Sequence, residues 1–150
     1  MNLAEKARAI ANDRNQKIQT AIQEIVNYFK EYLNSNKFEQ LIEKEISNPT
    51  TQRDGYGFIV LKTDYEYAKD QETKEKKVIA TINLEGKKWI RPDNFFETHG
   101  ISFDEIRIEV CRQLHAITKD KLREMGFTAE RYNPTDELGV CTYFWIRFTW

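Results

Sequence analysis

Cysteine and histidine are scarce in this chain, and their scarcity excludes several kinds of site. The sequence of 150 residues holds 2 cysteines and 2 histidines. Cys111 and Cys141 form no Cys-x-x-Cys pair and show no framework spacing, so we predict neither a disulfide between them nor a metal site. We interpret both cysteines as core residues of a cytoplasmic protein.

Motifs for common enzymatic reactions are also missing. Gly55-Tyr56-Gly57 lacks the Lys-Ser or Lys-Thr pair and the following helix of a phosphate-binding loop. No serine lies in a nucleophile elbow, and Ser102 is explained by helix capping. A hydroxyl residue follows His99 and His115 at three positions, whereas two-histidine phosphoesterases place it at two positions. We therefore expect no enzyme and no cofactor, and a small phosphoesterase is the weakest hypothesis for the function.

Long apolar runs and an excess of one charge are absent as well. No segment approaches the roughly 20 apolar residues of a membrane-spanning helix, and residues 1–6 lack the apolar core of a signal peptide. Basic side chains number 23 and acidic ones 24, and the resulting net charge of -1 offers no global attraction for nucleic acid or an anionic membrane. The length suits one domain over residues 1–150. Aromatic residues make up 13% of the chain, so many of them need burial or a partner.

The first 33 residues show the apolar periodicity of a long amphipathic helix. The apolar stripe consists of Leu3, Ala7, Ile10, Ile18, Ile22, Ile25, Phe29 and Tyr32. Its second part has coiled-coil-like spacing, and a homo-oligomer would use Ile18, Ile22, Ile25 and Phe29. Poor helix formers at residues 12–15 leave open whether this segment is one helix or two. A shorter amphipathic helix over Phe38–Ile46 ends at Asn48-Pro49, which completes a helical part over residues 1–48.

After residue 50 the apolar period becomes that of strands. Phe58–Leu61 and Lys77–Leu84 are predicted strands, and Trp89–Ile90 is a brief third strand that ends at Pro92. The segment Asp64–Lys76 between the first two strands is too polar to bury. We therefore predict an exposed loop there.

The sequence Ser102-Phe103-Asp104-Glu105 is a capping box, and it predicts a helix that begins at Phe103. Gly126 supplies the left-handed C-terminal cap. The buried face is expected to comprise Phe103, Ile106, Val110, Leu114, Ile117 and Met125, with Leu122 beside it. A strand over Phe127–Tyr132 and a turn over residues 133–136 follow.

The final strand, Val140–Trp150, carries aromatic residues on both of its faces. The row predicted to face the core is Val140, Phe144, Ile146, Phe148 and Trp150, interrupted by Thr142. The other row is Cys141, Tyr143, Trp145, Arg147 and Thr149. Because Tyr, Trp and Arg dominate interface hot spots, we predict partner-binding residues in this second row: Tyr143, Trp145 and Arg147.

Strands and helices come in runs along the chain, which predicts an α+β fold with an antiparallel sheet. We expect two N-terminal helices, one of them long. A later helix should pack with them on one face of a four- to five-stranded sheet formed within residues 55–150.

One segment suits nucleic-acid binding. Its candidate contacts are Lys87, Lys88, Trp89 and Arg91, where cations surround a ring that could stack on a base. The alternative is that Trp89 anchors the sheet to a helix in the core. The near-zero net charge favours this alternative.

Three features together resemble small uncharacterised proteins of bacteriophages and prophages: a long N-terminal amphipathic helix, a late helix that ends at Met125-Gly126-Phe127, and an aromatic strand that ends at Trp150. The resemblance covers the first and last thirds of the chain and leaves residues 50–98 outside it. It implies a cytoplasmic protein of a mobile element, an accessory or anti-defence factor such as an anti-CRISPR inhibitor. Because catalytic motifs are absent, we hypothesise a non-enzymatic interaction protein that binds a partner protein or its own copy. The alternative is a nucleic-acid or nucleotide-binding accessory protein.

Overall fold

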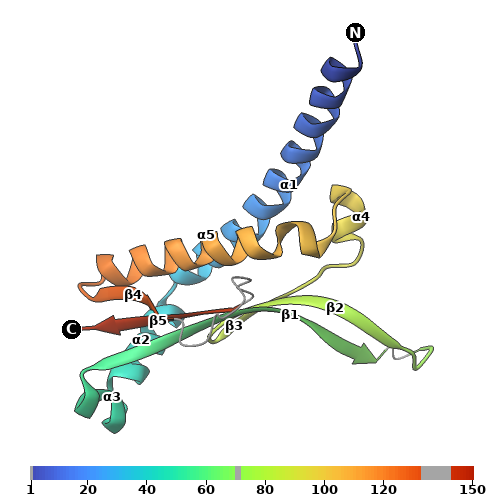
Figure 1. Ribbon diagram of the computed structural model, residues 1–150. Helices are drawn as coiled ribbons and strands as arrows, with labels where there is room; N and C mark the ends of the chain where they lie inside the picture. Colours follow the sequence, from blue (N-terminus) through green and yellow to red (C-terminus); the bar gives the residue numbers. More distant parts are fainter. Residues whose placement is uncertain (1, 70–71, 133–142) are drawn as a thin grey trace.

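The chain folds as an α+β protein with a five-stranded antiparallel sheet (Figure 1). The computed structural model describes residues 2–69, 72–132 and 143–150. Its helices are α1 (Leu3–Leu33), α2 (Asn36–Ile46), α3 (Pro49–Asp54), α4 (Phe95–His99) and α5 (Phe103–Glu124). Its strands are β1 (Tyr56–Lys69), β2 (Lys76–Leu84), β3 (Lys87–Ile90), β4 (Thr128–Tyr132) and β5 (Tyr143–Thr149). The strand order is β3-β2-β1-β5-β4 with antiparallel neighbours, so the predicted fold class is confirmed.

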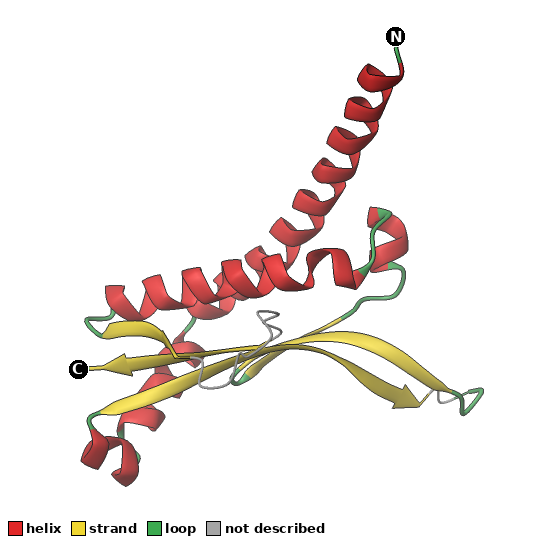
Figure 2. Cartoon of the chain, viewed as in Figure 1, coloured by secondary structure: helices red, strands yellow, loops and turns green. Residues whose placement is uncertain are grey.

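The sheet has two different faces because side chains alternate along each strand. The buried side chains of its core face are Ile59, Leu61, Ala80, Ile82, Leu84, Phe144, Ile146 and Phe148. Helix α5 crosses this face, and α1 packs against α5, as Figure 2 shows. On the opposite face, the described side chains of β1 and β5 are half-buried or exposed. We call this opposite side the open face.

Helix α5 begins where the capping box predicts. The Ser102 N–H donates to Glu105 Oε2 at 2.6 Å, and the helix starts at Phe103. Gly126 follows the helix with a φ of 99°, a left-handed conformation that glycine adopts without strain. Of the predicted apolar face, the buried side chains are Phe103, Ile106, Val110, Leu114 and Leu122, and the half-buried ones are Ile117 and Met125.

The long N-terminal pattern forms one continuous helix, α1, although its two halves differ. The C-terminal half enters the core through Ala21, Ile22, Ile25, Val26, Phe29, Tyr32 and Leu33. The N-terminal half leaves the protein body, as the blue end of the ribbon in Figure 1 shows, and every residue from 2 to 13 is exposed. Ile18 is half-buried. A homo-oligomer seam through Ile22, Ile25 and Phe29 does not fit this fold, because these side chains are buried inside the chain's own core.

The predicted loop over Asp64–Lys76 is wrong at both ends. Strand β1 continues to Lys69 and β2 begins at Lys76, so backbone pairing extends far along a hairpin that projects beyond α5 (Figure 1). A projecting hairpin pairs its backbone groups while its charged side chains stay in water. The polar composition of this segment therefore does not prevent strand formation.

Two short helices were not predicted from the sequence. Helix α3 has a local signal, because Asn48 Oδ1 accepts from the Thr50 N–H at 2.9 Å and Pro49 occupies the first turn. Helix α4 lacks such a signal, since its N-cap Asn94 makes no side-chain capping bond and has a φ of 62°.

Most of the core row predicted for the last strand is confirmed. Phe144, Ile146 and Phe148 are buried. Trp150 follows the end of β5 and is 57% exposed, so its predicted core position is wrong. Cys111 is buried, as predicted. The remaining predictions for this region lie outside the described residues: Val140, Cys141, Thr142 and the turn over residues 133–136.

Candidate protein-binding surface

The open face carries an aromatic cluster centred on Phe58 of β1. The centroid of the Phe58 ring lies 5.5 Å from that of Tyr56, 5.4 Å from that of Tyr132 and 5.3 Å from that of Trp145. These rings come from β1, β4 and β5, which are neighbours in the sheet. The contacts to Tyr56 and Trp145 are edge-to-face, the arrangement that the charge distribution of aromatic rings favours. We call these four aromatic residues together with Arg147 the open-face cluster.

Arg147 of β5 is the cation of this cluster. Its guanidinium carbon lies 5.8 Å from the ring centroid of Tyr56 and 5.7 Å from that of Tyr132. Its Nη2 atom is 3.6 Å from Glu130 Oε2 on β4, and the Arg147 side chain keeps 39% of its surface exposed. Contact with two rings holds the guanidinium in place while leaving part of it accessible to a partner.

Two of the three predicted partner-binding side chains lie on this face. Trp145 and Arg147 point away from the core, as the alternation along β5 predicts, and both are half-buried. Tyr143 pairs with Lys62 of β1, but its side chain lies outside the described residues. The cluster members that the sequence did not identify are Tyr56, Phe58 and Tyr132.

Trp89, the ring of the candidate nucleic-acid segment, lies in the core. Its side chain is 6% exposed, and its ring centroid is 5.2 Å from that of Phe95 and 6.4 Å from that of Phe96. These contacts agree with the alternative that Trp89 anchors the sheet to a helix in the core. The Trp89 ring therefore offers no accessible face to a base.

The cations beside Trp89 are divided between the two faces of the sheet. Lys87 Nζ lies 4.7 Å from the ring centroid of Tyr28 on α1. Lys88 Nζ pairs with Glu66 Oε2 of β1 at 2.6 Å. The Arg91 guanidinium lies 6.0 Å from an aromatic ring of α4. These contacts do not gather the three cations into one basic surface.

The two histidines have different surroundings. His99 Nε2 of α4 lies 2.8 Å from Glu24 Oε2 of α1. His115 of α5 is 8% exposed, and its ring lies 5.1 Å from that of Phe144. Burial, followed by the charge of Lys119, lowers the pKa of His115 to about 4. Among the described hydrogen bonds, none joins the two histidines.

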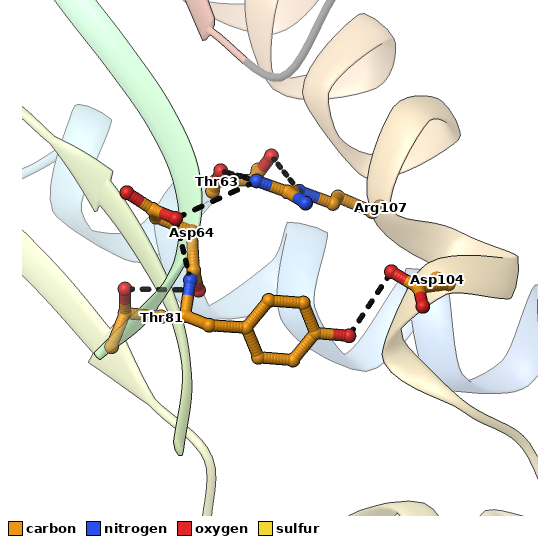
Figure 3. Close-up of polar contacts among 6 residues, drawn as sticks. Thr63, Asp64, Thr81, Asp104 and Arg107 are labelled. Atoms are coloured by element: carbon orange, nitrogen blue, oxygen red, sulfur yellow. Dashed lines mark hydrogen bonds and ion pairs between the residues drawn. The ribbon is translucent and has the colours of Figure 1, made fainter. Parts of the chain in front are cut away.

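A polar junction links the first turns of α5 to β1 (Figure 3). Arg107 Nη2 donates to the Thr63 carbonyl at 2.6 Å and lies 3.7 Å from Asp64 Oδ1. The Tyr65 hydroxyl donates to Asp104 Oδ1 at 3.0 Å, and burial together with this carboxylate raises the pKa of Tyr65. Because these groups bind one another, we interpret the junction as a structural tie between the hairpin and α5.

Metal ligation and similarity to known proteins give no guide to the function of the described part of the chain. Among residues 2–69, 72–132 and 143–150, no three His, Cys, Asp or Glu side chains are arranged to hold a metal ion. None of the helices in these ranges is both long and apolar enough to span a bilayer. No family model, curated protein or solved structure matches the chain. The surface chemistry is therefore the basis for a functional assignment.

Proposed function

We propose that this chain is a non-enzymatic interaction protein that binds a partner protein through the open-face cluster. The observation that carries the proposal is the gathering of four aromatic rings and Arg147 on the sheet face opposite α5. Trp, Tyr and Arg are the side chains most enriched in interface hot spots. Rings that already contact one another lose little conformational freedom when a partner covers them. Because the sequence resembles small proteins of bacteriophages and prophages, the expected partner is a host protein, such as a component of a defence system.

The cluster suits a protein better than a nucleic acid. Base stacking needs accessible ring faces, but Phe58 and Trp145 are half-buried and meet edge-to-face. Tyr132 is 41% exposed, which suits an anchor at the border of a protein interface. The charge of Arg147 is offset by Glu130, and the chain as a whole has a net charge of -1.

The first step of the test identifies the partner by photo-crosslinking in a bacterial host. A photo-reactive amino acid replaces Tyr132 in one variant and Arg112 in the control. Arg112 lies on α5 with 69% of its side chain exposed, so the control samples the helical side of the protein. We expect a protein that crosslinks from position 132 and not from position 112.

The second step titrates that purified partner with variants of the chain. Trp145→Ala should weaken binding by about 2 kcal/mol or more, which is roughly a 30-fold rise in Kd. The matched control is Asn83→Ala, an exposed open-face position on β2 outside the cluster, and it should leave Kd unchanged.

Thermal melting separates a binding defect from a folding defect. Because Trp145 is half-buried, Trp145→Ala should cost less than the roughly 3–5 kcal/mol of a fully buried tryptophan. A collapse of Tm, or an unchanged Kd with a normal Tm, would contradict the proposed surface. Tight, steeply salt-dependent binding to single-stranded DNA or RNA would favour the nucleic-acid alternative instead.

A further inference from the structure

The first turns of α1 form an arm that the rest of the chain does not cover. We call residues 3–13 the N-terminal arm. Leu3, Ala7 and Ile10 lie on one side of it, and Leu3 and Ile10 are 84% and 67% exposed. An isolated helix of this length is marginal in water, so contact of the apolar stripe with another surface would stabilise the arm.

An anchor at the base of the arm directs it away from the body. Arg14 Nε donates to Glu105 Oε1 at 3.0 Å, and the same guanidinium donates to the Gly100 carbonyl. These contacts fix α1 at the corner between α4 and α5. Beyond Arg14 the arm extends past this corner into solvent (Figure 1).

A groove of about 370 Å³ lies between α2 and the C-terminal end of α5. Its apolar lining comprises Leu33, Phe38, Ile42, Ile46, Met125 and Phe127. Ile46, Met125 and Phe127 are half-buried, so part of this lining remains open to solvent. The exposed ring of Trp150 extends the apolar surface at one end. We call this feature the α2–α5 groove.

The N-terminal arm cannot reach the α2–α5 groove of its own chain. Leu3 and Leu33 belong to one unbroken helix, and a rise of 1.5 Å per residue places them about 45 Å apart. Figure 1 shows the N terminus and α2 at opposite ends of the molecule. An arm in this groove must therefore come from another copy.

One border of the apolar stripe on the arm carries an exposed cation, Lys6. At 100° per residue, Lys6 lies at one edge of the stripe with Asp13 beside it, whereas Arg8 and Glu5 lie toward the opposite side of the helix. Lys6 and Arg8 are exposed, and neither is ion-paired with any of the described residues. Asp13 is paired with Lys17 at 3.1 Å, so Lys6 is the unpaired charge that accompanies the apolar side chains of the arm.

The border of the α2–α5 groove is acidic. Glu39 and Glu43 line it from α2, and no described cation pairs with either carboxylate. Lys121 also lines the groove. Its Nζ atom donates to Asn34 Oδ1 at 3.3 Å and lies 3.7 Å from Glu124 Oε1, so its charge is already paired. The unpaired carboxylates of the groove are therefore opposite in sign to Lys6 at the edge of the arm's apolar stripe.

We propose that the N-terminal arm of one copy packs into the α2–α5 groove of a second copy. Leu3 and Ile10 enter the apolar lining, and Lys6 meets the glutamates of the border. Reciprocal exchange closes a two-fold dimer, whereas one-way exchange links copies head to tail. The open-face cluster takes no part in this contact, so the test of self-association is independent of the proposed partner-binding function.

Analytical ultracentrifugation of the full chain over a range of concentrations tests the proposal. The wild type should exceed its monomer mass of 17.9 kDa as the concentration rises. Ile10→Asp should raise the dissociation constant about tenfold or more. Ala9→Asp is the matched control, because it adds the same charge to the polar side of the same turn, and it should self-associate like the wild type.

Charge reversal tests the pairing of the two surfaces. The double change Glu39→Lys and Glu43→Lys should weaken association, and adding Lys6→Glu should restore part of the lost affinity. Mixing Ile10→Asp with the groove double variant should also give a heterodimer, since each protein supplies the surface that the other lacks. A wild type that stays monomeric at every soluble concentration, or an Ile10→Asp variant that associates normally, would overturn the proposal.

Discussion

The imidazole of His115 is a buried titratable group whose Nε2 atom has no described hydrogen-bond partner. Its ring packs against Phe144, where water is excluded. Burial first, and then the charges of Lys119, Arg131 and Arg123, disfavour the protonated ring and lower its pKa from 6.5 to about 4. His115 is therefore neutral in the folded protein throughout the range in which an ordinary histidine becomes charged.

This shift predicts acid sensitivity with a defined direction. Between pH 6.5 and about 4 the unfolded state binds more protons at His115 than the folded state, so acid favours unfolding. The free energy of unfolding should fall by on the order of 3 kcal/mol across this window and gain nothing above it. Urea unfolding at a series of pH values would measure the fall, which His115→Gln should lack and the control His99→Gln should retain. Parallel curves for the wild type and His115→Gln would show that another group is responsible.

At the scale of the elements, the start of α5 performs two tasks through one carboxylate. Glu105 accepts from the Ser102 N–H and from Arg14, and these bonds lower its pKa to about 2, the Arg14 bonds contributing most. The capping box thus stabilises α5 and also anchors the N-terminal arm. Because the folded pKa lies below the ordinary value of 4.5, this contribution is present above pH 4.5 and is lost as the pH falls toward 2.

Removal of the cap hydroxyl should weaken α5 without affecting either proposed binding surface. Ser102→Ala is expected to cost about 1 kcal/mol of unfolding free energy through the lost N-terminal hydrogen bond. Ser47→Ala, at the exposed C-terminal end of α2, is the control and should change stability by less than about 0.5 kcal/mol. Urea unfolding measures both. An equal effect of the two substitutions would argue against a capping role for Ser102.

Sequence patterns predict those elements whose ends are set by residues close by in the chain. The capping box and Gly126 define α5 because both act within a few residues of the helix ends. The outer half of β1 is different, since its charged residues become a strand through pairing with β2. Such pairing depends on contacts between segments and leaves little trace in the composition of either one.

The open-face cluster could be predicted from the sequence only in part. Alternation along β5 places Trp145 and Arg147 opposite the core row. The addition of Phe58 and Tyr132 depends on the strand order β1-β5-β4, which is a property of the whole sheet. A single strand therefore reveals which side chains share its face, but not which side chains lie beside them.

At the scale of the whole molecule, α1 belongs to the core at one end and to solvent at the other. Ile25 and Ile10 share its apolar stripe, yet Ile25 has no exposed surface and Ile10 is 67% exposed. Ile25→Asp should place an unpaired carboxylate in the core and cost about 3–5 kcal/mol. Ile10→Asp should change the Tm of the dilute protein little. Thermal melting compares the two variants, and a similar loss of Tm in both would mean that the arm packs on the body.

The length of α1 also sets a distance for any assembly of this protein. Because the helix is unbroken, it places Leu3, the first residue of the N-terminal arm, about 45 Å from Leu33 at the α2–α5 groove. Two copies joined arm to groove would hold their open-face clusters at a fixed spacing. A partner with repeated binding sites at that spacing would engage the second cluster at a high effective concentration after the first had bound. The protein would then select partners by the geometry of their repeats as well as by the chemistry of a single site.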